Sequence, residues 1–351
     1  MLAMSGGVDS SVAALLLQKQ GYEVLGLTYI TWQDYNTTNT TIVNKTVDEA
    51  MRVAKLLGIE HFVLDIRQEF KDSIIKYFSD EYVAGRTPNP CVFCNGLLKF
   101  PYLREFAIKH KCDFISTGHY ASVVFNEGRY GIQKGIDPIK DQSYFLWRLN
   151  QEELSMLLLP LGSMMKSEIK ELARQNNLEH YAEKRESHGI CFIPDDDYRK
   201  FFEQQMPEVL MRIKPGKILS SQGESLGEHK GLAYYTIGQR KGINVAVGHP
   251  IFITKLKFDD NSIIMGEREE LNRYSLIAND DKWMKFADMP ENIVFHTKIR
   301  NINSGSPAIL KRQDDKSLYV EFMQPVWGVT PGQSVVFYDG DQVAGGAFIS
   351  E

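Results

Sequence analysis

The chain has 351 residues, of which 43% are hydrophobic and 24% are charged, and its formal net charge is −5. This length predicts two or three domains with at least one large core, and the composition is typical of a globular protein. The negative charge does not indicate a nucleic-acid binder, although local patches decide that question more than the total does. No apolar run approaches the roughly 18 residues of a membrane helix, and no secretory signal is seen, so we expect a cytoplasmic protein that contacts no membrane.

The first 195 residues alternate between strand-like and helix-like patterns. The expected strands are 1–4, 24–30, 61–65 and 114–117, and the expected helices are 10–20, 47–57, 69–82 and 97–109. This alternation predicts a Rossmann-like parallel sheet covered by helices. The segment Trp32 to Lys45 is rich in Asn and Thr and is expected to be a loop, either a plain surface loop or an active-site lid.

The pattern changes after about residue 210, where glycines separate short β-prone runs. These runs include 232–237, 251–256, 294–299, 318–322 and 334–338. Many short strands at regular spacing are typical of small β-barrels or sandwiches. We therefore expect an α/β N-terminal domain followed by two small β-rich domains, the last of them a β-barrel.

A glycine-rich segment, Ser5 to Ser11, lies between the first expected strand and helix. Gly6 and Gly7 have no side chains, so their backbone N–H groups can approach an anion, and the helix N-terminus adds partial positive charge. Asp9 and the serines suit the first turn of the helix and can also contact phosphate oxygens or Mg²⁺. No Gly-Lys-Ser/Thr follows, so the segment is not a Walker A loop.

The four cysteines are expected to be reduced in a long chain without a signal peptide. Cys112 opens an apolar strand and is expected to be a small buried hydrophobe. The other three lie in two distinctive segments, Thr87–Asn95 with Cys91 and Cys94, and Ser187–Ile193 with Cys191. These segments point to sulfur chemistry.

The segment Ser5 to Ser11 resembles the PP-loop of the N-type ATP pyrophosphatases, which bind ATP, attach AMP to a carbonyl oxygen and release pyrophosphate. Together with the two cysteine segments, the chain resembles the tRNA-specific 2-thiouridylase (MnmA) family. Further matching segments are 117–121, 140–146, 235–242 and 329–333, so the resemblance covers nearly the whole chain.

This resemblance implies ATP-dependent 2-thiolation of the wobble uridine of tRNA. ATP adenylates the C2 oxygen, and a persulfide on Cys191 supplies the sulfur, which attacks C2 directly or after Cys94 releases it as hydrosulfide. A Cys94–Cys191 disulfide is one outcome of the cycle. An accessible thiolate suits each sulfur step.

The resemblance also implies site residues. Those for ATP are Ala3, Met4, Ser5, Gly6, Gly7, Val8, Asp9, Ser10, Tyr29 and Gly118. Those for the target base and the tRNA are Asn89, Pro90, Cys91, His119, Lys140, Asp141, Gln142, Arg300, Asn301 and Gln333. Basic residues expected to meet the RNA backbone are Arg240, Lys241, Lys255, Lys257, Lys298, Arg300, Lys311 and Arg312.

Two features depart from the family pattern. Many members carry Asp where this chain has Cys91. This third thiol is compatible with a [4Fe-4S] cluster on Cys91, Cys94 and Cys191, with a zinc site completed by His188 or His119, or with a resolving thiol. Only residues 1–4 precede the loop, where relatives have a longer first strand, so either the start is genuinely short or residues are missing. A central strand this short would weaken the sheet under the ATP site.

The resemblance finally suggests domains and partners. Residues 1–200 are expected to form the ATP-binding catalytic domain, 201–270 a central β-rich domain and 271–351 a tRNA-binding β-barrel. The expected partners are ATP with Mg²⁺, tRNAs for Lys, Glu and Gln, and a sulfur-relay protein or cysteine desulfurase, with the enzyme a monomer. Two alternatives are an amidating PP-loop synthetase of the argininosuccinate or GMP synthetase type and a non-catalytic RNA-binding relative.

Overall fold

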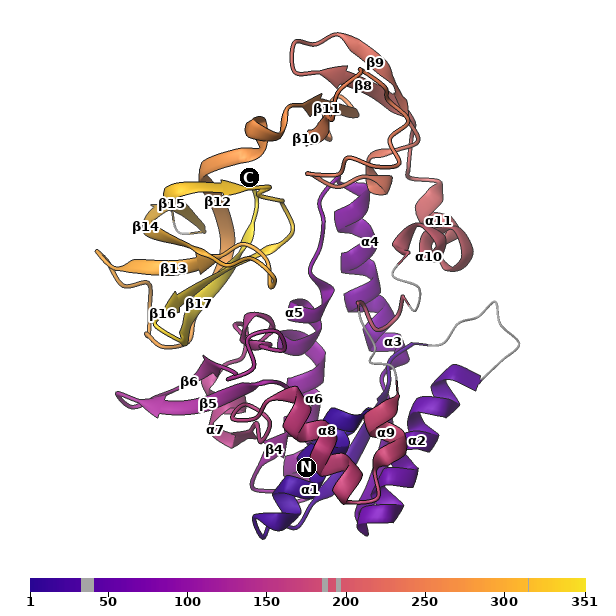
Figure 1. Cartoon of the computed structure of the whole chain (residues 1–351), viewed down its shortest axis with the longest axis vertical. Helices are drawn as coiled ribbons and strands as arrows, with labels where there is room; N and C mark the ends of the chain where they lie inside the picture. The colour runs from indigo at the N-terminus through magenta and orange to yellow at the C-terminus, as the bar shows by residue number, and fades with distance from the viewer. Residues whose placement is uncertain (33–40, 185–188, 194–196, 315) are drawn as a thin grey trace.

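The structure is a computed structural model that describes residues 1–32, 41–184, 189–193, 197–314 and 316–351 (Figure 1). An α/β domain forms the lower part of the molecule in this view, a small β-sheet domain lies at the top, and a barrel lies beside both. Among the described residues, no helix is long and apolar enough to cross a membrane.

The N-terminal domain contains a five-stranded parallel sheet with the order β3-β2-β1-β4-β7. The strands are β1 (Leu2–Ala3), β2 (Leu25–Ile30), β3 (Glu60–Asp65), β4 (Ile115–Ser116) and β7 (Leu157–Leu158). Successive residues of a strand point to opposite faces. Accordingly, Met1 belongs to the core that contains helix α6, and Leu2 to the core that contains helix α1.

Helices cover both faces of this sheet, as expected for a buried parallel sheet. They include α1 (Val8–Lys19), α2 (Thr41–Leu57), α6 (Phe100–Lys109), α7 (Gln151–Met156), α8 (Lys166–Gln175) and α9 (Glu179–Glu183). Strand β1 has only two residues, but it lies in the middle of the sheet and pairs with both β2 and β4. The expected loop from Trp32 to Lys45 is wrong at its end, because α2 already begins at Thr41, whereas residues 33–40 lie outside the described part.

Two continuous helical runs each contain one π-helical turn. The first joins α3 (Arg67–Phe70), the π-turn Lys71–Ile75 and α4 (Lys76–Val83), and it extends toward the upper domain (Figure 1). The second joins α5 (Pro90–Cys94), the π-turn Asn95–Lys99 and α6. Single π-turns inside α-helices are frequent at functional sites.

The central domain is a four-stranded sheet with the order β10-β11-β8-β9. Its strands are β8 (Gly216–Ser220), β9 (Ser225–His229), β10 (Phe252–Lys257) and β11 (Ser262–Gly266). Ile218, Ile253 and Ile263 form its small core. Helices α10 (Tyr198–Gln205) and α11 (Pro207–Leu210) precede it, and short 3₁₀ turns occur at Leu232–Tyr234 and Arg268–Leu271, with a third at Ser143–Phe145 in the first domain.

The C-terminal domain is a closed six-stranded antiparallel barrel. Its strands are β12 (Asn272–Trp283), β13 (Val294–Lys298), β14 (Ser306–Asp314), β15 (Ser317–Trp327), β16 (Ser334–Asp339) and β17 (Gln342–Ile349), and pairing of β12 with β17 closes it. The hairpin β5 (Ala121–Asn126) and β6 (Arg129–Lys134) of the first domain joins the barrel sheet where Gln133 pairs with Gln342. The predicted fold class is confirmed.

Candidate active site

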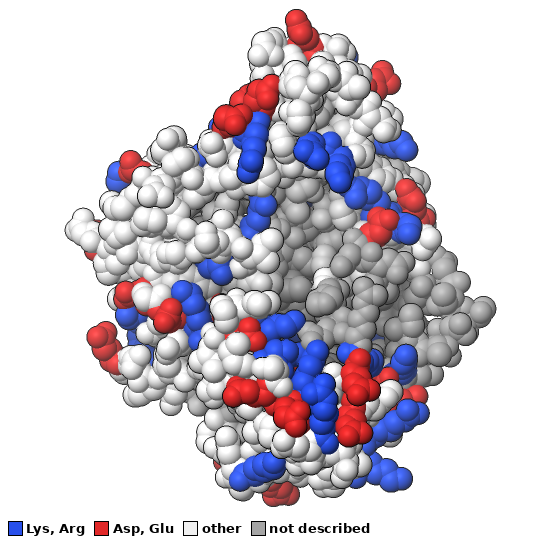
Figure 2. Space-filling model, viewed as in Figure 1, with Lys and Arg blue, Asp and Glu red and all other residues white. Residues whose placement is uncertain are grey.

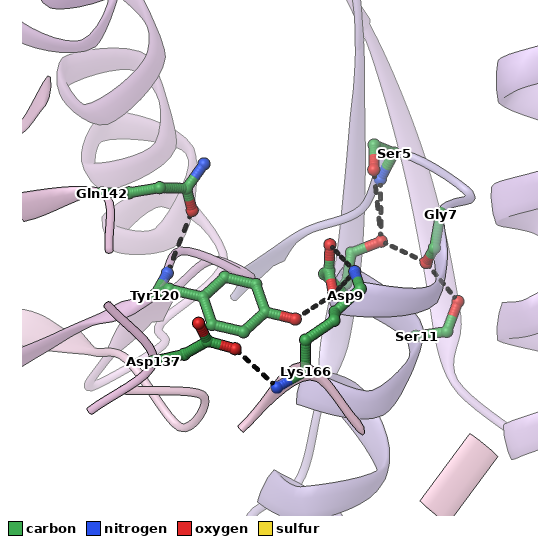
Figure 3. Close-up of polar contacts among 9 residues, drawn as sticks. Ser5, Gly7, Asp9, Ser11, Tyr120, Asp137, Gln142 and Lys166 are labelled. Atoms are coloured by element: carbon green, nitrogen blue, oxygen red, sulfur yellow. Dashed lines mark hydrogen bonds and ion pairs between the residues drawn. The ribbon is translucent and has the colours of Figure 1, made fainter. Parts of the chain in front are cut away.

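The glycine-rich segment forms a tight loop between β1 and α1. Helix α1 begins at Val8, directly after Gly7. The hydroxyl groups of Ser10 and Ser11 donate to the Gly7 carbonyl at 3.2 and 2.8 Å, and the Ser5 N–H donates to Ser10 Oγ at 3.2 Å (Figure 3). These bonds fold the loop back on the first turn of the helix.

Two features of this loop, its backbone conformation and the close approach of α2, require glycine at Gly6. Its φ is +68°, a left-handed conformation that favours glycine. A Cβ atom there would also lie 2.8 Å from Glu49 Cβ and 2.9 Å from the backbone nitrogen of Ala50, both on α2. Helix α2 therefore packs directly against the loop.

Gly118, which follows strand β4, lies against the start of α1. A Cβ atom at this position would approach Ser10 N to 2.9 Å and Asp9 C to 3.0 Å. These are backbone atoms at the start of α1, and they cannot easily move aside for a side chain. Gly118 thus allows the end of β4 to touch the loop, which is where the resemblance expects ATP.

Asp9 is bound by two side chains from distant parts of the chain. Lys166 Nζ lies 2.7 and 2.9 Å from its two carboxylate oxygens, and the Tyr120 hydroxyl donates to Oδ1 (Figure 3). Lys166 is the first residue of α8, and its side chain is 10% exposed. The Asp9 side chain is 35% exposed, so the ion pair is buried on the lysine side and partly open on the aspartate side.

Cys91 and Cys94 lie on the short helix α5. Pro90 is its first residue, and Asn89 caps it by accepting the Val92 N–H at 3.4 Å. Pro is pre-organised for the first position of a helix, and Asn is a favoured N-cap. The local sequence therefore places the two thiols three residues apart, within one helical turn.

Cys191 lies close enough to α5 for its charge to affect Cys91 and Cys94, and all three cysteines are free thiols. Burial, with the negative charge of Cys191, raises the pKa of Cys91 to about 12. Burial also raises the pKa of Cys94, to about 11, and that of Cys191. Cys191 is nevertheless exposed.

Lys99 acts on all three thiols and was not identified from the sequence. Its positive charge lowers the pKa values of Cys91, Cys94 and Cys191 against the effect of burial, and its backbone N–H also donates to Cys94. The sequence could have identified Lys99 by its position, because it lies five residues after Cys94 in the same helical run.

Tyr29 lies beside the thiols. Its hydroxyl donates to the Lys99 carbonyl at 2.9 Å, and burial, with the charge of Cys94, raises its pKa. The end of β2 is therefore tied to the run that carries the cysteines, and this contact occupies the hydroxyl proton of a residue expected to bind ATP.

The thiols do not form a metal site as they are arranged. Within residues 1–32, 41–184, 189–193, 197–314 and 316–351, no group of three or more His, Cys, Asp or Glu side chains is placed to hold a metal ion. His188, one suggested zinc ligand, lies outside these ranges. The three thiols, as the described residues place them, therefore do not by themselves form a metal site, and the proposed mechanism uses no cluster.

An aromatic cluster holds helix α5. The Phe93 ring stacks on Tyr77 with a centroid distance of 4.1 Å, and the Arg148 guanidinium lies 5.3 Å from the centroid of the Phe93 ring. Phe348 of the barrel lies 6.0 Å from Phe93, and Arg148 binds Asp280 of the barrel at 2.7 Å. The C-terminal domain therefore helps to position the thiol helix.

Gln333 strengthens this contact between domains. Its Nε2 donates to the carbonyls of Thr87 and Pro88 at 2.9 and 3.2 Å, and the Thr87 N–H donates to the Pro331 carbonyl at 2.8 Å. The resemblance suggests Gln333 for tRNA contact, and the structure gives it this additional role at the entry to α5.

The segment expected to contact tRNA is held by internal hydrogen bonds. Asp141 is buried and accepts bonds from the N–H groups of Gly135 and Ser143, and Gln142 Oε1 accepts the Tyr120 N–H at 3.0 Å. Lys140 is half-buried. Asp141 and Gln142 thus shape the turn that presents Lys140.

His119 is a neutral side chain near the thiols. Its Nδ1 lies 2.7 Å from Thr117 Oγ1. Burial and the nearby charge of Lys99 lower its pKa to about 3. His119 therefore offers a phosphate no positive charge at neutral pH, although it can still form a hydrogen bond.

Arg300 and Asn301 lie at the end of β13, on the barrel. Arg300 Nη2 donates to the Gly328 carbonyl and, at 3.3 Å, to Thr330 Oγ1, and burial lowers its pKa. Asn301 Oδ1 is buried, and no described residue donates to it. Arg300 therefore braces a barrel loop.

The expected basic set does not form one free patch. Lys257, Lys311 and Arg312 pair with Asp260, Glu321 and Asp281. On the face shown in Figure 2, Lys and Arg side chains lie at several separate points. On this face, basic groups are therefore not concentrated on the barrel.

Comparison with known proteins matches the chain along its whole length. Residues 1–195 match a tRNA methyl transferase HUP domain, residues 201–267 a tRNA methyl transferase PRC-barrel domain, and residues 273–349 an aminomethyltransferase beta-barrel domain.

The curated relatives share one name. The chain is 42% identical to the tRNA-specific 2-thiouridylase MnmA of Amoebophilus asiaticus, over 99% of this chain and 94% of the relative. It is also 42% identical to the protein of that name from Carboxydothermus hydrogenoformans, over 100% and 97%. A solved U34-tRNA thiolase, NcsA from Methanococcus maripaludis with its [4Fe-4S] cluster, is 20% identical with a TM-score of 0.35 over 59% and 67%, a likeness too weak to bear on this site. The chain belongs to the family of tRNA-specific 2-thiouridylases.

Proposed function

We propose that this protein is an ATP-dependent sulfurtransferase that converts the wobble uridine of tRNA to 2-thiouridine. One juxtaposition supports this proposal above all. Gly118 touches the start of α1 at Ser10, and its neighbour His119 lies within reach of the charge of Lys99, which also acts on Cys91, Cys94 and Cys191. The loop, and the lysine whose charge acts on all three thiols, therefore both lie near this one dipeptide.

The loop serves the activation step. The backbone N–H groups at Gly6 and Gly7 and the N-terminus of α1 receive the phosphates of ATP, with Mg²⁺ offsetting part of their charge. The uridine C2 oxygen attacks the α-phosphorus, and the bond to pyrophosphate breaks. The oxygen then leaves as part of AMP, a far better leaving group than the unmodified carbonyl oxygen.

The thiols serve the transfer step. Cys191 carries a persulfide, and the Cys94 thiolate attacks its inner sulfur, which releases hydrosulfide and forms a Cys94–Cys191 disulfide. Hydrosulfide then attacks C2 and displaces AMP. An external thiol reduces the disulfide and returns both cysteines to the free state.

The exposed surface of Cys191 supports loading by another protein, either a sulfur-relay protein or a cysteine desulfurase. We infer from the family that the substrates are tRNAs for Lys, Glu and Gln, and that the enzyme works as a cytoplasmic monomer. Phosphate contacts make tRNA binding depend steeply on salt. An affinity that does not change between low and physiological salt would contradict tRNA as the partner.

The deciding experiment separates activation from transfer. Wild type, Cys94→Ser, Cys191→Ser and the control Cys112→Ser are incubated with tRNA, ATP and a persulfide donor, and both pyrophosphate and 2-thiouridine are measured. We expect the first two variants to release pyrophosphate without forming 2-thiouridine, and Cys112→Ser to behave as wild type. Full product from Cys94→Ser and Cys191→Ser would reject the sulfur mechanism and favour an amidating synthetase.

Cys91 is tested in the same assay. In this proposal it is neither a metal ligand nor the persulfide carrier, so Cys91→Asp, which restores the residue that many relatives carry, is expected to keep at least half of the activity. Loss of 2-thiouridine in Cys91→Asp with normal pyrophosphate release would instead make Cys91 an essential third thiol.

A further inference from the structure

The ion pair between Asp9 and Lys166 joins the loop to a part of the chain 157 residues away. Asp9 is the second residue of α1, so its carboxylate lies in the first turn of the helix. A negative charge at this position opposes any anion that the same helix end would bind. Lys166 Nζ bonds both carboxylate oxygens and removes most of that opposition.

Lys166 is itself held from several sides. Its Nζ lies 5.5 Å from the centroid of the Tyr120 ring, and the Tyr120 hydroxyl donates to the same carboxylate. The Lys166 backbone N–H donates to Asp137 at 3.0 Å (Figure 3). The buried Asp137 also accepts the N–H groups of Ile139 and Lys140. The lysine is therefore anchored at both its backbone and its ammonium group.

We propose that Lys166 is a positioning residue for ATP binding, which holds Asp9 and neutralises its charge so that the loop between β1 and α1 retains its affinity for phosphate. Tyr120 supports the same carboxylate, and Asp137 fixes the start of α8. This inference rests on the proposed ATP site and adds residues that neither the loop motif nor the implied site identified.

The proposal is tested by binding ATP to the full-length protein by calorimetry and by measuring tRNA-dependent pyrophosphate release at varied ATP. Lys166→Met leaves the Asp9 charge facing the phosphates and is expected to raise the Kd and KM for ATP about tenfold, with kcat within about threefold of wild type. Lys166→Arg retains the charge and is expected to recover most of the affinity. Tyr120→Phe removes one donor but no charge, so a change of about threefold or less is expected.

A double-mutant cycle shows whether the lysine acts through Asp9. In Asp9→Asn the charge that Lys166 neutralises is gone, so adding Lys166→Met is expected to change the Kd for ATP by less than about twofold. The double variant also avoids leaving an unpaired charge in the site. Arg174→Met, an exposed cation on the same helix that pairs with Glu171, is the control and should bind ATP as wild type does.

Two results would overturn the proposal. The first is wild-type affinity for ATP in Lys166→Met. A lysine with a merely structural role would give this result together with a lower melting temperature of the variant, so that combination also overturns the proposal. The second is an unchanged effect of Lys166→Met in the Asp9→Asn background. Because ATP binding is measured without tRNA, these results remain informative even if thiolation itself fails.

Discussion

Different kinds of contact hold the loop between β1 and α1, which is proposed to bind ATP, and helix α5, which carries Cys91 and Cys94. The loop is fixed by polar bonds within the first domain, with the Ser11 hydroxyl on the Gly7 carbonyl and Lys166 on Asp9. Helix α5 is fixed largely by aromatic packing, and part of that packing comes from Phe348 of the barrel. The loop is thus held within one domain, whereas the position of the thiols depends on two.

In the proposed mechanism, this difference separates activation from sulfur transfer. A change in the barrel can disturb the thiols without reaching the loop, and a change beside the loop can abolish ATP binding without moving the thiols. The barrel is connected to α5 through Gln333 and through Arg148, which pairs with Asp280. The variants below test this separation.

The largest effect is expected from Gly118→Val. Its added carbons meet backbone atoms of Asp9 and Ser10 that lie about 3 Å from an ideal Cβ, so the loop must shift. We expect ATP affinity to fall at least about a hundredfold, with a smaller loss in Gly118→Ala. Affinity is measured by calorimetry.

The thiols provide the internal control for this variant. If the two regions are separately held, alkylation of Cys94 should proceed in Gly118→Val at the wild-type rate. A valine variant that binds ATP normally would contradict the packing. One that loses both ATP and native thiol reactivity would show that the regions form a single unit.

The next effect is expected from Phe348→Ala. Removing this half-buried ring takes contacts from Phe93, Trp147 and Arg148 and should lower the free energy of unfolding by about 2 kcal/mol. We expect 2-thiouridine formation to fall about tenfold, while the KM for ATP stays within about twofold. Phe258→Ala, at an exposed phenylalanine of the central domain, is the matched control.

A third effect concerns the protonation of the thiols. Because burial raises the pKa of Cys94 to about 11, the alkylation rate of Cys94 should rise about tenfold per pH unit from pH 7 to 9.5 without levelling. Lys99→Met removes a charge that lowers this pKa, so it should slow alkylation at every pH in that range. Peptide mass spectrometry follows Cys94 separately, and a plateau below pH 8 would contradict the buried thiol.

The sequence located the features that depend on neighbouring residues. Two glycines between a strand and a helix predict the loop, and β-α alternation predicts the parallel sheet. The boundaries were less accurate: the expected strand 1–4 is Leu2–Ala3, and the expected helix 97–109 is the end of a run that begins at Pro90. The start of this run was hard to locate, because neither Pro90 at its first position nor the π-turn Asn95–Lys99 interrupts the apolar pattern of the sequence.

The residues that support the site could not be found in this way. Lys166 lies 157 residues from Asp9, and Gln333 lies 246 residues from Thr87, so no local pattern connects them. The first contact needs the first domain to have formed, and the second needs the C-terminal domain to pack against it. The residues implied by the family resemblance remain predictions for ATP and tRNA contact, and the structure adds that Asp141, Gln142 and Arg300 also hold their own loops.

The smallest effect is expected from Gln333→Leu. This change removes the two bonds to the carbonyls of Thr87 and Pro88 but keeps the approximate shape, so it should cost about 1 kcal/mol of unfolding free energy and reduce thiolation less than about fivefold. Gln333→Glu places a carboxylate against the same carbonyls and should be the more damaging of the two. ATP binding should be unchanged in both.

Affinity for tRNA, measured separately, decides how Gln333 acts. If its main task is to dock the barrel on the entry to α5, unfolding and thiolation change together and the Kd for tRNA does not. A weakened Kd in Gln333→Leu with unchanged stability would instead make Gln333 a direct tRNA contact, and the barrel would then influence the thiols mainly through Phe348 and Arg148.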